Sequence, residues 1–201
     1  MALKNKLGIT SSSELAREEK ITKKRALELF DRGRINEIEA GTFKGLSSIH
    51  KYIFGDIYDF AGKIRDENIA KGSFRFAPVV YLEVSLQNID KMPQGDFDEI
   101  VEKYVEMNVA HPFREGNGRS TRIWLDLILK KEIGKVIDWS KVEKQDYLLA
   151  MERSPIRNIE IKYLLKNALT DNVNDREVYM KGIDQSYHYE GYNLYKIDEL
   201  I

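Results

Sequence analysis

Reactive side chains are concentrated in one segment of the sequence, which reads His111-Pro-Phe-Arg-Glu-Gly-Asn-Gly-Arg-Ser-Thr-Arg122. Gly116 and Gly118 flank Asn117, so the main chain there can adopt positive φ and let a ligand approach closely. The N–H groups that follow begin a predicted helix, where they lack intrahelical partners and lie at the positive end of the helix dipole. Phosphate is the usual anion at such helix starts. The segment therefore predicts a phosphate site, to which Asn117 can donate its side-chain amide.

Charged and titratable side chains in the same segment extend this chemistry. Arg119 and Arg122 lie three residues apart, hence on one face of the first helical turn, and add two permanent positive charges. Glu115 is placed to hold a divalent cation, because Mg²⁺ needs only one or two carboxylates beside phosphate oxygens and water. His111 has an ordinary pKa suited to proton transfer near neutral pH. Together these residues predict transfer from a nucleotide to an acceptor whose proton His111 removes.

The segment as a whole resembles the signature of the Fic family, His-x-Phe-x-Glu-Gly-Asn-Gly-Arg-x-x-Arg, over residues 111–122. This resemblance implies an all-α Fic fold and AMPylation, the transfer of AMP from ATP to a Ser, Thr or Tyr hydroxyl of a target protein, with Mg²⁺ or Mn²⁺. It also implies a role for each matched position. These are His111 as general base, Phe113 as core anchor, Glu115 as metal ligand, Gly116, Asn117 and Gly118 as the anion hole, and Arg119 and Arg122 as phosphate ligands.

One glycine bears on the choice of reaction. In the related Doc-type toxins, which phosphorylate their targets, lysine replaces the second glycine of the loop. Here that position is Gly118, so the main chain itself can approach the phosphates. The resemblance therefore favours a nucleotidyltransferase that transfers AMP.

Helical periodicity predicts the elements that position this loop. Asp96 begins a predicted helix that runs to Val109, and the segment after the loop, residues 123–129, is apolar except for Asp126. A helix that is apolar nearly all round belongs in the middle of a domain, so we expect a buried helix–loop–helix unit. Other helices are expected over 11–33, 42–62, 78–92, 143–154, 159–169 and 176–189. His50, among apolar neighbours, is interpreted as a structural histidine.

A change of periodicity predicts a β-hairpin over residues 63–77, which we interpret as a flap. Its open edge would be a liability unless a partner used it. The resemblance implies that the flap holds the target by main-chain pairing, and a plain connecting hairpin is the alternative. The residues assigned to target docking are Ser73, Phe74, Arg75 and Phe76, and those assigned to the nucleotide are Lys71 and Gly72.

The last predicted helix carries Ser186 and Glu190 four residues apart, hence on one face, with Gly191 as a stop signal. This pattern resembles the inhibitory motif of Fic proteins that carry their own C-terminal inhibitory helix. The resemblance implies that Glu190 pairs bidentately with Arg122 in place of the γ-phosphate, while Ser186 fixes the helix against the loop. We therefore divide the chain into a catalytic domain over residues 1–170, with its active-site loop at 111–118, and an inhibitory helix and tail over 171–201.

Three alternatives accompany this interpretation. Glu190 could orient water or help hold a metal, which would make the chain a de-AMPylase or a bifunctional enzyme. A catalytically silent Fic-like binding module is disfavoured because no active-site group is missing. Tyr187 and Tyr189 could accept AMP themselves if the last helix detached.

Composition limits the classes of partner. The chain has 201 residues, of which 32 are basic and 33 acidic, giving a formal net charge of −1. This balance predicts no attraction to nucleic acid or to a membrane surface. The N-terminal sequence has no apolar signal core, and there is no cysteine, which fits a reducing compartment. We expect a bacterial-type protein of the cytoplasm, with export by a dedicated secretion machine and assembly into a homo-oligomer both left open.

Overall fold

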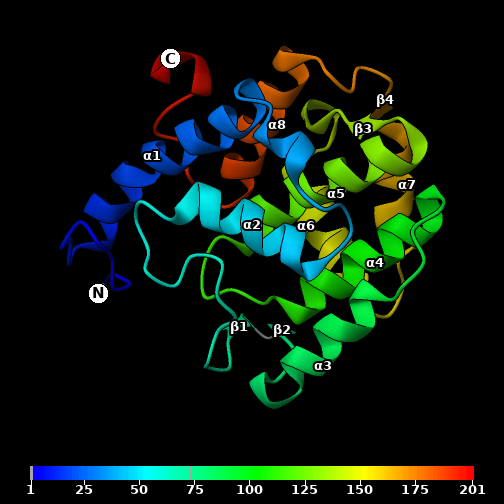
Figure 1. The fold of residues 1–201 in the computed structure, drawn as a ribbon, viewed down its shortest axis with the longest axis horizontal. Coiled ribbons are helices and arrows are strands. Elements are labelled where there is room, and N and C mark those ends of the chain that lie inside the picture. Colours follow the sequence, from blue (N-terminus) through cyan, green and yellow to red (C-terminus); the bar gives the residue numbers. More distant parts are fainter. Residues whose placement is uncertain (1, 73) are drawn as a thin grey trace.

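The computed structural model describes residues 2–72 and 74–201, and helices make up most of it (Figure 1). The expectation of an all-α protein with a small hairpin is confirmed. The helices are α1 (Ser12–Asp31), α2 (Phe43–Phe54), α3 (Val79–Asp90), α4 (Phe97–Ala110), α5 (Asn117–Ile133), α6 (Lys144–Arg153), α7 (Ile159–Asn167) and α8 (Arg176–Tyr189), with 3₁₀ turns η1 (Arg34–Glu37), η2 (Trp139–Lys141) and η3 (Ile197–Leu200). The strands are β1 (Ala70–Lys71), β2 (Phe74–Arg75), β3 (Val136–Ile137) and β4 (Leu169–Thr170).

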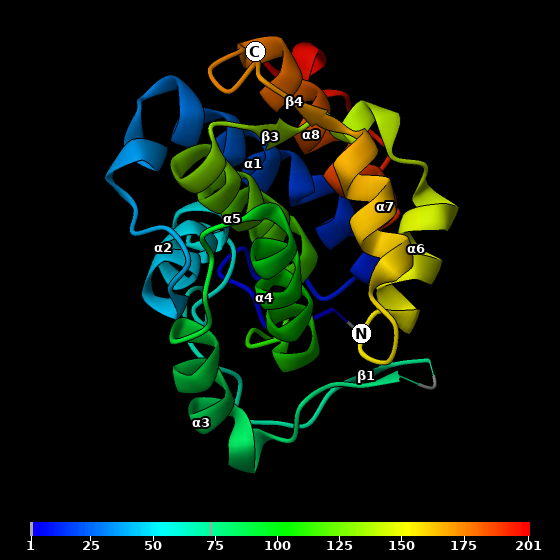
Figure 2. The same cartoon turned by 90° about the vertical axis from the view of Figure 1, so that its right-hand side faces the viewer.

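Helix α5 lies in the middle of the fold, in contact with α2, α4 and α8 (Figure 2). Its apolar residues from Ile123 to Leu129 are buried, as the sequence predicts. Each such side chain stabilises the fold by about 1.5–3 kcal/mol through burial. The polar exception, Asp126, accepts hydrogen bonds from the main-chain N–H of Ile137 and from Trp139 Nε1, each at 2.8 Å. Burial raises the pKa of Asp126 to about 7. Asp126 therefore ties α5 to the segment that leads into η2.

Side-chain caps explain why four of the predicted helix starts are correct. Ser11, Thr42 and Asp96 accept a hydrogen bond from a main-chain N–H in the first turn of α1, α2 and α4, and Asp175 accepts two at the start of α8. These caps satisfy N–H groups that have no intrahelical partner.

The second helix was predicted to continue to Gly62, and this was wrong, because α2 ends at Phe54. Turns follow, and they still bury Ile57 and Tyr58, so the apolar spacing persists after the helix has stopped. Gly62 takes φ of 77° in this segment. Periodicity alone could not separate these turns from a further helical turn.

The expected hairpin is shorter than predicted. In the part of residues 63–77 that the structure describes, only Ala70–Lys71 and Phe74–Arg75 pair, with Lys71 opposite Phe74. The hairpin projects from the helical body (Figure 2). Ser73, one of the residues assigned to docking, lies outside the described residues.

Helix α8 and the tail pack against α1 (Figure 1). The Lys23 ammonium, buried in α1, lies 2.5 Å from Asp184 and donates to the carbonyl of Tyr195 at 2.5 Å. The short antiparallel pair β3–β4 was not predicted. Over residues 2–72 and 74–201, the search for a helix with the length and hydropathy of a membrane span finds none.

Candidate active site

The reactive loop joins the C-terminus of α4 to the N-terminus of α5. His111 is the C-cap of α4, with φ of 48° and ψ of 62°, and its N–H donates to Met107 O. Gly116 is the N-cap of α5, with φ of 77°. Asn117 and Gly118 were predicted to belong to the loop but are the first two residues of the helix. Positive φ is therefore needed at Gly116 and not at Gly118.

The two glycines are required for different spatial reasons. A Cβ at Gly116 would lie 2.5 Å from the ring of Phe54. At Gly118, which keeps helical backbone angles, a Cβ would overlap the carboxylate of Glu190. The surface at Gly118 is thus open to an anion, and in this structure that anion is a glutamate.

Asn117 does not aim its amide at the anion site, contrary to expectation. Its Oδ1 accepts from Phe113 N at 2.8 Å, and its Nδ2 donates to Phe113 O at 2.6 Å. The side chain is buried and closes the loop on itself. Asn117 therefore shapes the loop, while the free N–H groups of the first turn of α5 remain the groups suited to an anion.

His50 packs against the loop from α2, and its position fits the structural role expected for it. The ring stacks on Phe113 at 3.8 Å between centroids, and Nδ1 accepts from Gly62 N at 2.9 Å. Nε2 must then carry the hydrogen, which it donates to Glu115 O at 2.8 Å. Burial lowers the pKa of His50 to about 3. A neutral His50 with a fixed tautomer therefore holds both Phe113 and the main chain of Glu115.

The ring of His111 lies at the wall of an open cleft. Its Nδ1 is 3.3 Å from Asn108 O, and because a carbonyl only accepts, Nδ1 carries the hydrogen. The lone pair is then on Nε2. Burial lowers the pKa of His111 to about 4, with Arg65 and Lys71 acting in the same direction. At neutral pH His111 is thus uncharged and able to accept a proton. The ring also stacks on flap residue Phe76, at 3.6 Å between centroids.

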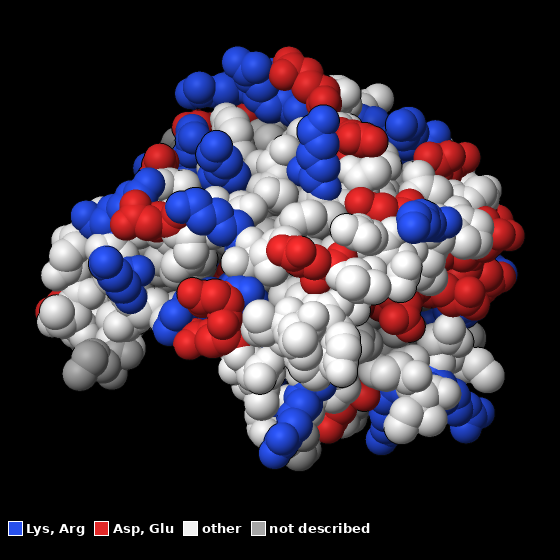
Figure 3. Space-filling model, turned by 60° about the horizontal axis from the view of Figure 1, so that its bottom comes forward, with Lys and Arg blue, Asp and Glu red and all other residues white. Residues whose placement is uncertain are grey.

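The cleft brings together most of the residues predicted from the sequence. It has a volume of about 770 Å³ and extends from the flap across the loop to α6 and α8. Predicted residues that line it are Lys71, Gly72, Phe74, Phe76, His111, Glu115, Gly116, Asn117, Gly118, Arg122 and Glu190. Arg75, Arg119 and Ser186 are not among its lining residues. On the face shown in Figure 3, basic and acidic side chains are intermingled.

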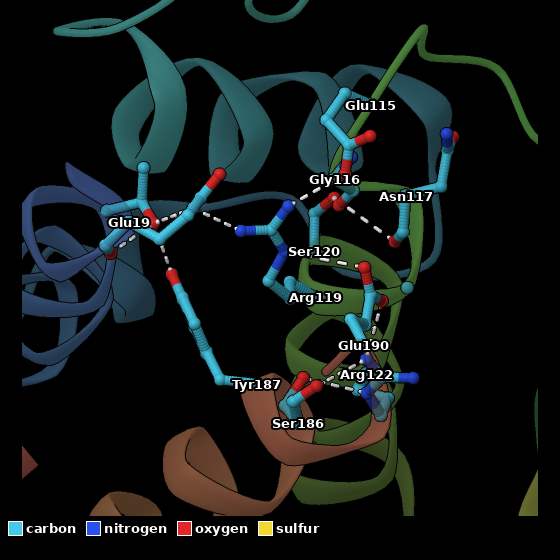
Figure 4. Close-up of polar contacts among 12 residues, drawn as sticks. Glu19, Glu115, Gly116, Asn117, Arg119, Ser120, Arg122, Ser186, Tyr187 and Glu190 are labelled. Carbon is cyan, nitrogen blue, oxygen red and sulfur yellow. Dashed lines mark hydrogen bonds and ion pairs between the residues drawn. The ribbon is translucent and has the colours of Figure 1, made fainter. Parts of the chain in front are cut away.

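Arg119 lies behind the cleft and not in it. Its guanidinium donates to Glu115 at 2.8 Å and is paired closely with Glu19 of α1 (Figure 4). Its Nε is 3.5 Å from Glu190 Oε2. Only 1% of Arg119 is exposed, so a phosphate could not reach it without displacing one of these carboxylates. Arg119 therefore organises acidic side chains, where the sequence had suggested a phosphate ligand.

Arg122 and Glu190 meet in the cleft, but not as the bidentate pair that was expected. Arg122 Nη2 donates to Glu190 Oε1 at 2.9 Å, while Oε2 faces Arg119 (Figure 4). The Nε of Arg122 donates to Ser186 Oγ at 2.7 Å, and Nη2 also donates to Ser186 O at 3.0 Å. Burial opposes ionisation of Glu190, but Arg119 and Arg122 outweigh it and lower its pKa. Glu190 is thus an ionised bridge between the two arginines.

Glu115 is the residue available to a cation. It is half-buried and lines the cleft, and its Oε1 accepts from Gly116 N at 3.0 Å. Burial raises its pKa, and Arg119 acts against this effect. Among the described residues, no group of three or more His, Asp or Glu side chains forms a preformed metal cage. The arrangement fits Mg²⁺ shared between one carboxylate, phosphate oxygens and water.

Two functional neighbours were missed from the sequence. Glu19 precedes Arg119 by 100 residues. The one hint in the sequence was that this acidic residue falls on the face of α1 that also carries the buried residues Leu15 and Thr22. Tyr147 of α6 was treated as an ordinary helix residue, yet its ring lies under Arg122 at 5.6 Å, and Tyr189 lies at 5.2 Å from the same guanidinium.

The tyrosines considered as AMP acceptors are both buried. The Tyr187 hydroxyl is 2.7 Å from Thr22 Oγ1, and the Tyr189 hydroxyl donates to Val142 O at 2.6 Å. Either could react only if α8 left its position.

Comparisons with known proteins agree on one family. Residues 42–129 match the sequence model of the Fic/DOC family. The chain is 30% identical to the protein adenylyltransferase VbhT of Bartonella schoenbuchensis, over 94% of this chain but only 44% of VbhT. It is also 30% identical to the probable protein adenylyltransferase y4lH of Sinorhizobium fredii, over 76% of this chain and 82% of that protein. The fold is shared with BepC of Bartonella tribocorum, solved with AMPPNP, at a TM-score of 0.67 and 20% identity, over 85% of this chain and 93% of that one.

The overlap at Gly116 gives a test of the loop that needs no activity assay. Gly116→Ala would place a methyl group against Phe54, at a left-handed backbone angle that costs an L-residue about 1–2 kcal/mol. Overpacking adds about 1–3 kcal/mol. Gly134→Ala, at the other end of α5, is the matched control, because φ there is 65° and no atom lies within 4 Å of the added Cβ. We expect urea unfolding to show a clearly larger loss for Gly116→Ala, and equal losses would contradict the packing described here.

Proposed function

The chain belongs to the Fic/DOC family, and on this premise we propose that it is a protein adenylyltransferase that transfers AMP from ATP to a protein hydroxyl and is inhibited by its own Glu190. One observation carries this proposal. An uncharged histidine whose Nε2 carries the lone pair lies in the same cleft as the N-terminus of a buried helix and Glu115. The names of VbhT and y4lH, and the AMPPNP bound to BepC, support ATP as the substrate.

The residues of the cleft can be assigned to steps of the transfer. Nε2 of His111 takes the proton of the acceptor hydroxyl while the oxygen of that hydroxyl bonds to the α-phosphorus. The bond from this phosphorus to the oxygen that bridges to the β-phosphate breaks, and pyrophosphate leaves. The first N–H groups of α5 and Arg122 stabilise the negative charge of the phosphates. Glu115 would hold Mg²⁺ or Mn²⁺, and a bound cation would add to the neutralisation of that charge.

The position of Glu190 supports inhibition by occupation of the anion site. Its carboxylate lies against Gly118 and pairs with Arg122. It therefore occupies the space that a phosphate group needs and neutralises the positive charge that would attract it. ATP can then bind only in a displaced pose, in which the α-phosphorus is not aligned with the acceptor oxygen.

The first experiment incubates the protein with α-³²P-labelled ATP, Mg²⁺ and bacterial lysate. We expect Glu190→Gly to raise labelling of protein at least tenfold over wild type, because the anion site becomes free. Adding His111→Ala should then reduce labelling about 10²–10⁴-fold, as loss of a general base does. The isosteric Glu190→Gln keeps the shape of the side chain but removes its charge, so it shows which of the two causes the effect of Glu190 on labelling. Absence of label with Glu190→Gly at every lysate concentration would falsify the transferase and favour a silent binding module.

Ser186→Ala tests whether the contacts of Ser186 with Arg122 contribute to inhibition. The change removes the acceptor of Arg122 Nε but leaves the main-chain acceptor Ser186 O in place. We expect partial release, with labelling between those of wild type and Glu190→Gly. Ser48→Ala is the control, because this serine of α2 is exposed and its hydroxyl donates to Lys44 O of the same helix, and it should leave labelling unchanged. If Ser186→Ala labels protein no more than wild type does, the Ser186 hydroxyl does not contribute to inhibition.

A second function, hydrolysis of AMP from modified protein, is favoured by the place of Glu190 in the same cleft as His111. An ionised carboxylate there can orient a water molecule towards an AMP-modified residue. If this activity exists, wild type should release label from pre-modified lysate and Glu190→Gly should not. Equal release by both proteins would show that Glu190 takes no part in it.

Target docking on the flap can be tested at one main-chain group. Phe76 N donates to Ile69 O at 3.4 Å, and Lys71 lies opposite Phe74. Antiparallel pairs alternate between bonded and non-bonded, so Ala70 and Arg75, which lie opposite each other, direct their main-chain groups outward. The N–H of Arg75 is therefore the group that an added target strand would use.

Arg75→Pro removes that N–H, whereas Arg75→Ala removes only the side chain. In the Glu190→Gly protein we expect Arg75→Pro to reduce labelling of lysate proteins at least tenfold, and Arg75→Ala to reduce it much less. Proline is tolerated at strand edges. Similar labelling by the two variants would mean that the flap does not bind its target by strand addition.

A further inference from the structure

Arg65 is a buried cation that the site described above does not use. It lies near the start of the flap segment, ahead of its paired strands, and only 4% of it is exposed. Its guanidinium donates to Glu67 O at 2.7 Å, to Ala77 O at 2.5 Å and to Ala110 O at 3.1 Å. Its Nε donates to His111 O at 2.8 Å. One side chain thus contacts main-chain carbonyls of three segments.

We infer that Arg65 is a positioning residue, which fixes the main chain of His111 and the two ends of the flap relative to one another. The inference rests on the proposed function, since it concerns the geometry of the proposed transfer. Arg65 is not a catalytic residue, because its contacts are with main-chain groups and not with the reacting atoms.

The first argument is the conformation of His111. Its φ of 48° is the one positive φ found among non-glycine residues in the described ranges. Such a backbone costs about 1–3 kcal/mol and persists only where its surroundings hold it. The carbonyls of Ala110 and His111 also lie at the end of α4, where carbonyls lack intrahelical partners and attract positive charge. Arg65 satisfies both carbonyls and so holds the residue that presents the imidazole.

The second argument is the connection to the flap. Glu67 and Ala77 lie on either side of the paired strands, and Arg65 binds the carbonyl of each. Arg65 N also donates to Pro112 O at 2.8 Å, and Ala77 N to Val109 O at 2.9 Å. The flap is therefore bonded to the chain on both sides of His111. A target strand bound at the flap would be held at a fixed distance from the imidazole.

The third argument is the shape of the guanidinium. It offers five N–H donors in a plane, and here it serves four carbonyls from one buried position. Lysine keeps the charge but has a single donor atom, so it can satisfy only part of this set. Arg65→Lys therefore removes the planar arrangement of donors but keeps the charge. Arg65→Met removes both.

Lys103 provides a matched control. It is also buried, with 1% exposure, and its ammonium donates to the carbonyls of Asp90, the last residue of α3, and of Met92, and to Gln94 Oε1. It lies outside the cleft. Lys103→Met therefore removes a buried cation that binds main-chain carbonyls without touching His111 or the flap.

The experiment places Arg65→Met, Arg65→Lys and Lys103→Met in the Glu190→Gly protein. At fixed lysate and saturating ATP, we expect Arg65→Met to lower the maximum labelling rate about 10–100-fold, as a misplacement near 1 Å does. Arg65→Lys should fall between it and the parent. The Kd for Mg²⁺–AMPPNP, measured by calorimetry, should change less than twofold. Lys103→Met should lower Tm comparably but leave the labelling rate unchanged.

A spectroscopic readout makes the test independent of activity. The chain has 3 histidines, so ¹³C-histidine labelling gives a simple NMR spectrum that single substitutions can assign. Arg65→Met should shift the His111 signal and leave those of His50 and His188 in place, and Lys103→Met should shift none. The inference is overturned if the His111 signal does not move, or if Arg65→Met and Lys103→Met lower the rate equally. Failure of the Glu190→Gly parent to label any protein would instead overturn the proposed function, and the NMR result would still decide the role of Arg65.

Discussion

The burial of two arginines, side by side on α5, is the constraint on which the rest of the site depends. Arg119 and Arg122 are 1% and 4% exposed. Removing an ion from water costs several kcal/mol even after relaxation, unless paired charges and hydrogen bonds replace the water. Three carboxylates do so here, from α1 (Glu19), from the loop (Glu115) and from the end of α8 (Glu190). Segments far apart in sequence must therefore pack around α5, because their carboxylates allow the two arginines near its N-terminus to stay ionised while buried.

The two arginines differ in what they can exchange. Arg119 is enclosed by Glu19 and Glu115 and by three aromatic rings, those of Phe54, Tyr187 and Tyr192, and these partners are part of the fold. Arg122 faces the cleft, and Glu190 is the partner that a phosphate could replace there. A phosphate that displaced Glu190 would place another anion beside Arg122, while Glu19 and Glu115 would still pair with Arg119. The proposed inhibition therefore keeps a negative charge beside Arg122 whether Glu190 or a phosphate is bound.

The sequence was sufficient for features that depend on local rules. Caps such as Ser11 and Thr42 defined helix starts, and the reactive segment and the Ser186–Glu190 pair were found through their resemblance to a known family. It was insufficient where a side chain finds its partner through tertiary packing. The pair between Glu19 and Arg119 spans 100 residues, and Arg65 binds main-chain carbonyls, which every residue offers. For the same reason the sequence treated Arg119 and Arg122 as equivalent, although packing places only one of them in the cleft.

The anchoring of α8 bears on how the proposed inhibition by Glu190 could be released. The helix is held on its α1 side by the Lys23–Asp184 pair and by the hydrogen bond between Thr22 and Tyr187, neither of which touches the cleft. Glu190 is the C-cap of the helix, where the helix dipole disfavours a negative charge. The two arginines, and not the helix, therefore stabilise the carboxylate in its position. Loss of the Glu190 contact therefore leaves the α1 contacts intact. Rotation of the Glu190 side chain away from Gly118 would clear the proposed anion site while the contacts of α8 with α1 stay in place.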